Sequence, residues 1–309
     1  MWITFTNIKF IWEETKMKIG IGTYSFGGMA SYLGLGPTLL EKFQTIAALG
    51  FNSVELLPVD LDNDVEDIQK WLDETGLTVT SVHAEPTNEI IDKMAALGGK
   101  AVIWAGTPFC NEAEAIEVAQ YMDKQAEYAE QYGIKIGYHN HEQEFTMDNG
   151  KCLLEHLLDN STKVYSQLDC GWATKGGMYP PYFIRKYKNR IVAIHVKENC
   201  KVTGPTQPQS RHAEGGAKPS PFANVKSMSL EERQAMLDKF TAMTAGPNPR
   251  FAIQCKMGAP ESNIDWKEIK KALDEQDFEA FWVVEREGFY DEHDKCIAED
   301  CAYIKENIQ

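Results

Sequence analysis

The sequence predicts a single-domain (β/α)₈ barrel, and three observations lead to that prediction. Strand-like and helix-like segments alternate about eight times after residue 16. The chain has 309 residues, 43% of them hydrophobic, which is enough for one large α/β core. No G-x-G-x-x-G turn follows the first strand-like segment, because Gly20-Ile21-Gly22 lacks the third glycine. A doubly wound open sheet is therefore the weaker alternative.

The predicted strands are short and apolar or β-branched, and they cover 18–22, 51–56, 78–83, 101–104, 134–139, 163–169, 191–196 and 280–285. The predicted helices cover 37–49, 65–75, 87–97, 112–132, 153–158, 182–187, 230–240, 266–274 and 295–304. Asn111 is the predicted N-cap of the longest helix, and Gly133 ends it. Residues 1–16 are expected to be an N-terminal extension, with the barrel covering 17–309.

One segment, 200–228, is irregular over an unusual length and contains several glycines and prolines. A loop this long in a compact domain is usually functional or mobile. Because it follows the seventh predicted strand, we expect it to lie over the mouth of the barrel. There it would help to close a site or contact a partner chain.

Charge and cysteine content exclude several classes of protein. The formal net charge is -15, from 31 basic and 46 acidic residues, so nucleic-acid and membrane partners are disfavoured. No run of about 18 apolar residues predicts a membrane span, and the N-terminus lacks the features of a signal peptide. Seven cysteines without a C-x-x-C pair favour reduced thiols and a cytoplasmic location.

Polar residues gather where the predicted strands end. These residues are Glu55, His83, His139-Asn140-His141, Asp169, His195-Val196-Lys197 and Glu285-Arg286-Glu287, and they include four of the seven histidines. In a barrel, polar residues at the carboxyl ends of strands are typical of an active site. Side chains two apart on a strand share a face, so His139 and His141 point the same way, as do His195 and Lys197.

Imidazole and carboxylate groups that converge from neighbouring strands would suit one divalent cation. Mixed ligands of this kind favour manganese, zinc or cobalt, with magnesium as a further option. The alternative for each residue alone is a polar group that is satisfied within a structural network. Because all of them fall at the same rim, the sequence predicts a metal site.

Seven short motifs in a fixed order resemble the xylose-isomerase-like barrel superfamily, from about residue 17 to the C-terminus. That superfamily includes sugar-phosphate isomerases and epimerases, keto-inositol dehydratases and an apurinic endonuclease branch. The motifs are Gly50-Phe51-Asn52-Ser53-Val54-Glu55-Leu56, Ser81-Val82-His83, Tyr138-His139-Asn140-His141-Glu142, Leu168-Asp169-Cys170-Gly171-Trp172, His195-Val196-Lys197-Glu198, Asn263-Ile264-Asp265-Trp266 and Trp282-Val283-Val284-Glu285-Arg286-Glu287.

The resemblance implies one bound metal ion, for which Mn²⁺ is the first choice. Relatives hold it with a glutamate, an aspartate, a histidine and a second glutamate. The last three correspond to Asp169, His195 and Glu285, and the first corresponds to His139. This histidine replaces one of the two glutamates that act as paired acid and base in the epimerases.

The catalytic assignments follow from that replacement. His141 is the expected general base, because a histidine titrates near neutral pH. Glu285 keeps a catalytic assignment, and Lys197 is a further candidate for the base. Glu142 or Glu144 is the alternative source of the missing carboxylate.

The expected substrate-binding residues are Glu55, His83, Trp172 and Glu287, with core packing as an equal alternative for the tryptophan. The resemblance implies that the substrate is a keto-sugar, a keto-polyol or a keto-glycoside. The expected reaction is removal of a proton next to a carbonyl group, which leads to isomerisation or epimerisation.

Two other functions stay open at this point. The same enolisation gives a lyase when a β-substituent leaves, as in dehydration or the deglycosylation of 3-keto-glycosides, including carbon-linked ones. The gap of 90 residues between His195 and Glu285 is long, and it favours a larger substrate, a homo-oligomer or a small second subunit. A non-catalytic sugar-binding protein is the third reading.

Overall fold

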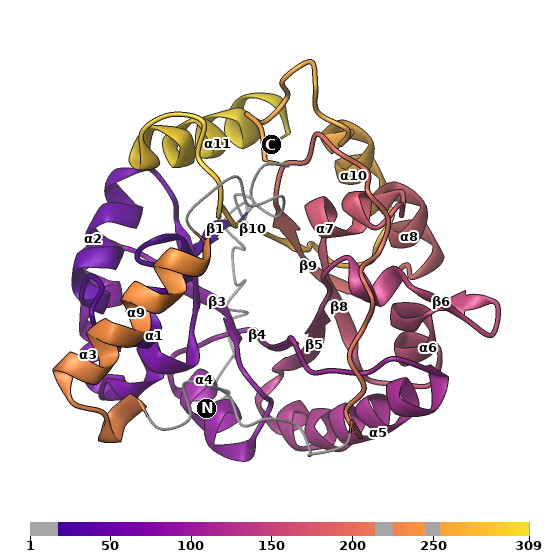
Figure 1. Cartoon of the computed structure of the whole chain (residues 1–309), viewed down its shortest axis with the longest axis horizontal. Helices are drawn as coiled ribbons and strands as arrows, with labels where there is room; N and C mark the ends of the chain where they lie inside the picture. The colour runs from indigo at the N-terminus through magenta and orange to yellow at the C-terminus, as the bar shows by residue number, and fades with distance from the viewer. Residues whose placement is uncertain (1–17, 214–224, 245–253, 309) are drawn as a thin grey trace, which may run out of the picture.

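Eight parallel strands close into a barrel in the order β1-β10-β9-β8-β5-β4-β3-β2 (Figure 1). The structure is a computed structural model that describes residues 18–213, 225–244 and 254–308. The barrel strands are β1 (Ile19–Gly22), β2 (Ser53–Leu56), β3 (Thr78–His83), β4 (Ala101–Ala105), β5 (Lys135–His139), β8 (Tyr165–Asp169), β9 (Ile191–Val196) and β10 (Phe281–Val284). The predicted barrel is confirmed, and every predicted strand overlaps an observed one.

Helices surround the strands, as Figure 1 shows. They are α1 (Met29–Tyr32), α2 (Leu39–Ala48), α3 (Val65–Thr75), α4 (Asn88–Ala96), α5 (Glu112–Ala129), α6 (Leu153–Asp159), α7 (Cys170–Lys175), α8 (Pro180–Lys186), α9 (Leu230–Thr244), α10 (Trp266–Leu273) and α11 (His293–Asn307). The sequence did not predict α1, the hairpin of β6 (Met147–Asp148) and β7 (Lys151–Cys152), or α7, which begins directly after β8.

Side chains cap several helices where the sequence provides the right residues. The Asn111 side chain accepts a hydrogen bond from the Glu114 N–H at 3.0 Å, which confirms the predicted N-cap of α5. Thr38 and Glu41 form a capping box at the start of α2. Gly76 ends α3 in the left-handed conformation, at φ 70°.

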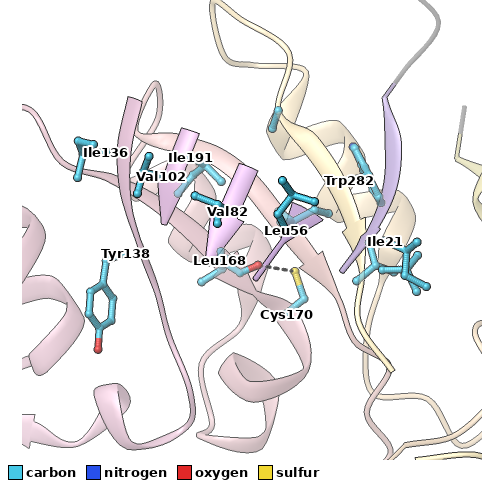
Figure 2. Packing of buried hydrophobic residues seen from close by; sticks show 14 of the residues in the cluster. Ile21, Leu56, Val82, Val102, Ile136, Tyr138, Leu168, Cys170, Ile191 and Trp282 are labelled. Atoms are coloured by element: carbon cyan, nitrogen blue, oxygen red, sulfur yellow. Dashed lines mark hydrogen bonds between the residues drawn. The ribbon is translucent and has the colours of Figure 1, made fainter. Parts of the chain in front are cut away.

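Alternation along the strands separates an apolar layer from a polar one. Leu56, Val82 and Leu168 are fully buried in the large cluster that packs strands against helices, part of which Figure 2 shows. On each strand, the residues next to these apolar ones face the interior of the barrel instead. In the same view the Cys170 thiol lies 3.8 Å from the Leu168 carbonyl oxygen, where the chain leaves β8 and enters α7.

A second, small apolar cluster fills the barrel below its polar rim. It comprises Ala101, Ile103, Val192 and Ala193, with Tyr165 and Phe281 packed against it. Gly137 leaves room for it, because a Cβ there would lie 2.7 Å from Ile103 Cδ1. His139 and His195 lie two residues after Gly137 and Ala193, so their side chains lie directly above this apolar cluster.

The first part of the irregular segment runs along the rim that carries the carboxyl ends of the strands. The N–H groups of Thr203 and Gly204 donate to the carbonyl oxygen of Lys175, at 3.1 and 2.9 Å. The Ser210 hydroxyl then donates to Glu114 at the start of α5, and Figure 1 shows this passage from β9 towards α5. Residues 214–224 of the predicted mouth loop and the predicted extension at 1–16 lie outside the described residues. Within the described ranges, no helix is both long and apolar enough to cross a bilayer.

Candidate metal centre and active site

Buried and half-buried polar side chains meet at the carboxyl ends of the barrel strands. They are Glu55 from β2, His139 from β5, Asp169 from β8, His195 and Lys197 from β9 and just after it, and Glu285 and Glu287 just after β10. We call these seven residues the mouth cluster. The strand register creates it, since Asp169 pairs with His195 across β8 and β9, and His195 pairs with Val283 across β9 and β10.

Four members of the mouth cluster could share one cation. Ligand atoms of His139, Asp169, His195 and Glu285 all lie within 4.8 Å of one another. His195 Nδ1 lies 2.7 Å from Glu285 Oε2 and 3.8 Å from Asp169 Oδ2. These are the four residues that the sequence predicted as metal ligands.

Asp169 shows a specific need for a cation. Its Oδ1 accepts a hydrogen bond from the Trp172 N–H at 2.7 Å, but its buried Oδ2 has no hydrogen-bond partner among the described residues. A buried carboxylate oxygen without a donor is costly, so a positively charged ligand would stabilise it. Two imidazole and two carboxylate donors fit a transition-metal ion such as Mn²⁺ or Zn²⁺.

The net charge of the mouth cluster also favours a bound cation. Lys197 is fully buried, with its Nζ 2.6 Å from Glu287 Oε2, 3.3 Å from Glu285 Oε2 and 4.0 Å from Asp169 Oδ2. Even with His195 protonated, the cluster holds two more carboxylates than cationic groups. A divalent cation would offset that excess of negative charge.

The protonation of the cluster follows from these neighbours. Burial lowers the pKa of His195, but Glu55 and Glu285 outweigh burial and raise that pKa to about 10. Burial raises the pKa of Asp169 to about 7 despite Lys197, and the nearby Glu285 carboxylate acts in the same direction as burial. Burial lowers the pKa of Lys197, but Glu285, Glu287 and Asp169 together hold it above its usual value. These carboxylates therefore favour the ammonium form of Lys197 over the free amine that a general base would need.

Glu55, a predicted substrate-binding residue, has another set of partners. Its Oε1 lies 2.7 Å from His195 Nε2 and 3.1 Å from His83 Nε2. Its Oε2 accepts from Ser81 Oγ and from Gln167 Nε2, both at 2.6 Å. Burial raises the pKa of Glu55, but the two histidines outweigh burial and lower it to about 2. Glu55 is thus an ionised carboxylate whose lone pairs are already used within the protein.

His141 lies next to the metal-binding group but outside it. Its ring centroid is 5.1 Å from that of His139 and 5.8 Å from that of Trp172. Glu144 accepts from the His141 N–H at 2.7 Å and from the Tyr138 hydroxyl at 2.9 Å. Both contacts hold the turn after β5 in place.

The alternative carboxylates have other partners. Glu142 Oε1 lies 2.8 Å from Lys175 Nζ and also accepts from the Thr206 hydroxyl, and Glu144 holds the turn after β5. Neither carboxylate belongs to a group of potential ligands among the described residues. The geometry therefore favours His139 over both as the fourth ligand.

Trp172 lies beneath the site rather than on its surface. Its side chain is 1% exposed, and the Nζ atoms of Lys175 and Lys197 each lie 4.7 Å from its ring centroid. The expected stacking on a sugar face does not fit this burial. The ring is placed there because α7 begins directly after Asp169 and because Gly171 lets β9 approach. A Cβ at Gly171 would lie 2.5 Å from the Lys197 carbonyl oxygen.

A pocket of about 200 Å³ opens above these residues. It is lined by Gly22, Tyr24, Tyr32, Glu55, Leu56, Leu57, His83, Ala105, Gly106, His139, His141, His195, Glu285 and Glu287. Three predicted substrate-binding residues therefore line it, namely Glu55, His83 and Glu287.

The sequence reasoning missed Tyr24, Tyr32 and Gln167. Tyr24 directly follows β1 and Gln167 precedes Asp169 by two residues, so strand-end position and alternation were usable signals for both. Tyr32 carries no such signal, because α1 was not predicted.

Comparison with known proteins gives consistent results. The family described as "Xylose isomerase-like TIM barrel" matches residues 43–307. An inosose dehydratase from Clostridium beijerinckii is 26% identical over 200 residues, which cover 54% of this chain and 65% of that protein, just under two thirds of its length.

Solved structures agree in fold. A sugar phosphate isomerase/epimerase from Parabacteroides distasonis superposes with a TM-score of 0.65 at 20% identity, covering 96% of each chain. A 3-keto-D-glucoside 4-epimerase from E. coli superposes with a TM-score of 0.58 at 14% identity, covering 94% of this chain and 99% of the other. The names of these relatives agree with the sequence prediction of an enzyme that acts on sugars.

Proposed function

Because the chain belongs to the xylose isomerase-like TIM-barrel family, we propose that it is a metal-dependent enzyme that removes a proton next to the carbonyl group of a keto-sugar or keto-polyol. One observation carries this proposal. Four nitrogen and oxygen donors, one of them an unsatisfied Asp169 oxygen, lie within 4.8 Å of one another, and the other three residues, His139, His195 and Glu285, line a pocket that His141 also lines. Polar groups in this arrangement at a barrel mouth are typical of catalysis.

His139, Asp169, His195 and Glu285 would hold the metal ion, for which Mn²⁺ is the first choice. When bound, the ion would polarise the substrate carbonyl and stabilise negative charge on its oxygen. Glu55 would keep His195 oriented through the contact at Nε2, and Lys197 would hold Glu285 and Glu287 in place.

His141 is the proposed general base. It lines the pocket beside His139 without belonging to the ligand group, so a nitrogen of its ring can accept the proton from the carbon next to the carbonyl. Glu285 is the proposed carboxylate for returning a proton. Lys197 acts as a hydrogen-bond donor to carboxylates, since its ammonium group cannot serve as a base.

The fate of the proton decides the outcome. Return to the other face of the carbon gives epimerisation, and return to the neighbouring carbon gives isomerisation. A lyase is the second candidate, because β-elimination needs no second base on the opposite face. His139 in place of a glutamate favours it, as does the similarity to an inosose dehydratase.

The pocket supports a small, uncharged substrate. Its volume of about 200 Å³ is below the usual range for drug-sized ligands. Its described lining contains the carboxylates of Glu55, Glu285 and Glu287 and no lysine or arginine. Substrate hydroxyl groups would find acceptors in Glu285 and Glu287, since the lone pairs of Glu55 are already used, and Tyr24 and Tyr32 also line the pocket.

Exchange of substrate hydrogen for solvent deuterium tests the proposal. The protein would be incubated in D₂O with Mn²⁺ and a panel of keto-sugars and keto-polyols, and the substrates analysed by NMR. We expect deuterium at the carbon next to the carbonyl with the native protein and none after chelation of the metal. Sugar binding without exchange would instead favour the non-catalytic reading.

A further inference from the structure

Gln167 lies at the centre of the polar network beneath the proposed metal site. It is fully buried on β8, two residues before Asp169 and on the same face of the strand. Its side-chain oxygen lies 2.6 Å from His83 Nε2 and 3.0 Å from His139 Nδ1. Its side-chain nitrogen lies 2.6 Å from Glu55 Oε2.

Glu55 fixes which way the Gln167 amide faces. An ionised carboxylate only accepts hydrogen bonds, so the atom of Gln167 that contacts Glu55 must be the NH₂ group. The carbonyl oxygen of the amide must then face the two histidines. Reversing the amide would bring its oxygen against the carboxylate and would leave the 2.6 Å contact with Glu55 Oε2 without a donor.

This orientation in turn fixes the hydrogens on the histidines. The amide oxygen only accepts, so His139 Nδ1 and His83 Nε2 must both carry hydrogen. The 3.1 Å contact from His83 Nε2 to Glu55 Oε1 requires the same of His83. A neutral His139 then has its lone pair on Nε2. Glu55 orients the ring of His195 in a similar way. Its contact with Nε2 leaves the other ring nitrogen, Nδ1, facing Asp169 and Glu285.

We infer that Gln167 is a positioning residue that holds His139 in the Nδ1–H tautomer and so directs its Nε2 lone pair to the metal. The inference rests on the proposed metal centre and adds a residue that touches neither metal nor substrate. The strand register supports it, because His139 and Gln167 are direct partners across β5 and β8. Such partners of ligating histidines typically change metal affinity by about 10–100-fold when they are replaced.

The tautomer can be measured directly in the native, metal-free protein. Two-bond ¹H–¹⁵N correlation spectra of histidine-labelled protein distinguish a protonated ring nitrogen from an unprotonated one. Comparison with a His139→Gln spectrum would identify the His139 signals. We expect a protonated Nδ1 and an unprotonated Nε2. A neutral His139 with its hydrogen on Nε2 would overturn the inference, whatever the result for any variant.

Metal affinity provides the second test, with a matched control on the same strand. Gln167→Met keeps the length of the side chain and removes both its donor and its acceptor, so titration calorimetry should show Mn²⁺ binding weakened by about 10–100-fold. Ser166→Ala changes the neighbouring buried residue, whose hydroxyl has no hydrogen-bond partner among the described residues, and should leave the affinity unchanged.

The outcomes separate the inference from the proposed function. Native affinity in Gln167→Met would overturn the role of Gln167 and leave the metal centre intact. A native protein that binds no divalent metal would overturn the proposed function, while the His139 tautomer would still decide what Gln167 does. A mixture of both His139 tautomers in Gln167→Met, with weakened binding, is the result that we expect.

Discussion

Two groups of polar residues meet at the end of β9, where Lys197 belongs to one and the next residue, Glu198, belongs to the other. The first is the mouth cluster. The second, which we call the Glu198 cluster, consists of Glu198, Asn199, Gly258, Ser262 and Trp266. Glu198 receives four hydrogen bonds, from Ser262 Oγ at 2.5 Å, Trp266 Nε1 at 2.8 Å, Asn199 N at 3.0 Å and Gly258 N at 3.3 Å. In the mouth cluster, Asp169 Oδ2 receives none from the described residues.

The difference separates a structural role from a ligand-binding role. Glu198 joins the end of β9 to α10 and to the loop before it, and its donors offset much of the cost of its burial. Asp169 is as deeply buried, but its Oδ2 atom lies 3.8 Å from His195 Nδ1 and 4.0 Å from Lys197 Nζ, too far for a hydrogen bond to either. Burial and charge alone do not identify a functional carboxylate; an acceptor that the protein leaves unsatisfied is the better sign.

The largest expected effect is that of Asp169→Asn. This change removes a ligand, so metal analysis after dialysis should find no bound ion, and activity should be lost. The metal-free variant should nevertheless melt at a higher temperature than the metal-free native protein at pH 8. The reason is that burial raises the pKa of Asp169 to about 7, so its ionised form destabilises the fold at a pH above both its unfolded and folded pKa values. A metal-free variant that melts lower would show that Asp169 is structural, like Glu198.

The second effect concerns a residue beside the ligands. His141→Ala should lower kcat by about 10²–10⁴, the usual contribution of a general base. Metal content should stay at the native level, because His141 is outside the ligand group. Steady-state kinetics and metal analysis on the same preparation test both statements. A variant with near-native kcat and only a raised KM would assign His141 to substrate binding instead.

A third effect is the pH dependence of metal binding. His195, with a pKa raised to about 10, and Asp169, with a pKa raised to about 7, hold protons in the metal-free protein at and below neutral pH. A metal ion must displace these protons, so affinity should rise with pH by about tenfold per unit for each proton released. Calorimetry in buffers with different ionisation enthalpies counts the protons. Affinity that is constant from pH 6 to pH 9 would contradict the assigned ligands.

The smallest effect is expected in the Glu198 cluster. Glu198→Gln places an NH₂ group among donors that need an acceptor, which should cost about 1–3 kcal/mol of unfolding free energy. Thermal or urea unfolding measures that loss, and native metal affinity and kcat in the same variant would confirm that the cluster is structural. A loss of metal with unchanged stability would reverse the comparison between the two clusters.

The sequence was sufficient for the barrel and for most of the mouth cluster. Alternating apolar residues predicted the strands, and polar residues at their ends identified Asp169, His195 and Glu285 before any geometry was known. The sequence did not reveal which neighbouring strands bring particular side chains together. The pairing of His139 with Gln167 depends on the register between β5 and β8, which are separated along the chain by the β6–β7 hairpin and α6.

Two of the expected site residues have surroundings that favour a different role. Trp172 was expected either to stack on a sugar or to pack in the core, and its burial favours the second, because α7 begins directly at Cys170 and turns the ring inward. Lys197 was a candidate base, but three carboxylates surround its ammonium group. Assembly with a second copy or a small subunit, and a cytoplasmic location, stay predictions.

The geometry of the site is sensitive to substitution at Gly171, although this residue has no charge. It has no polar side chain, yet its missing Cβ sets the distance of closest approach between the start of α7 and the backbone of Lys197. Asp169 and His195 are each two residues from this contact, on opposite sides of it. A side chain as small as a methyl group at position 171 would force β9 outward and would alter the spacing of two ligands at once. Mutational tolerance at this position therefore reports how accurately the barrel must be assembled for its cation to fit.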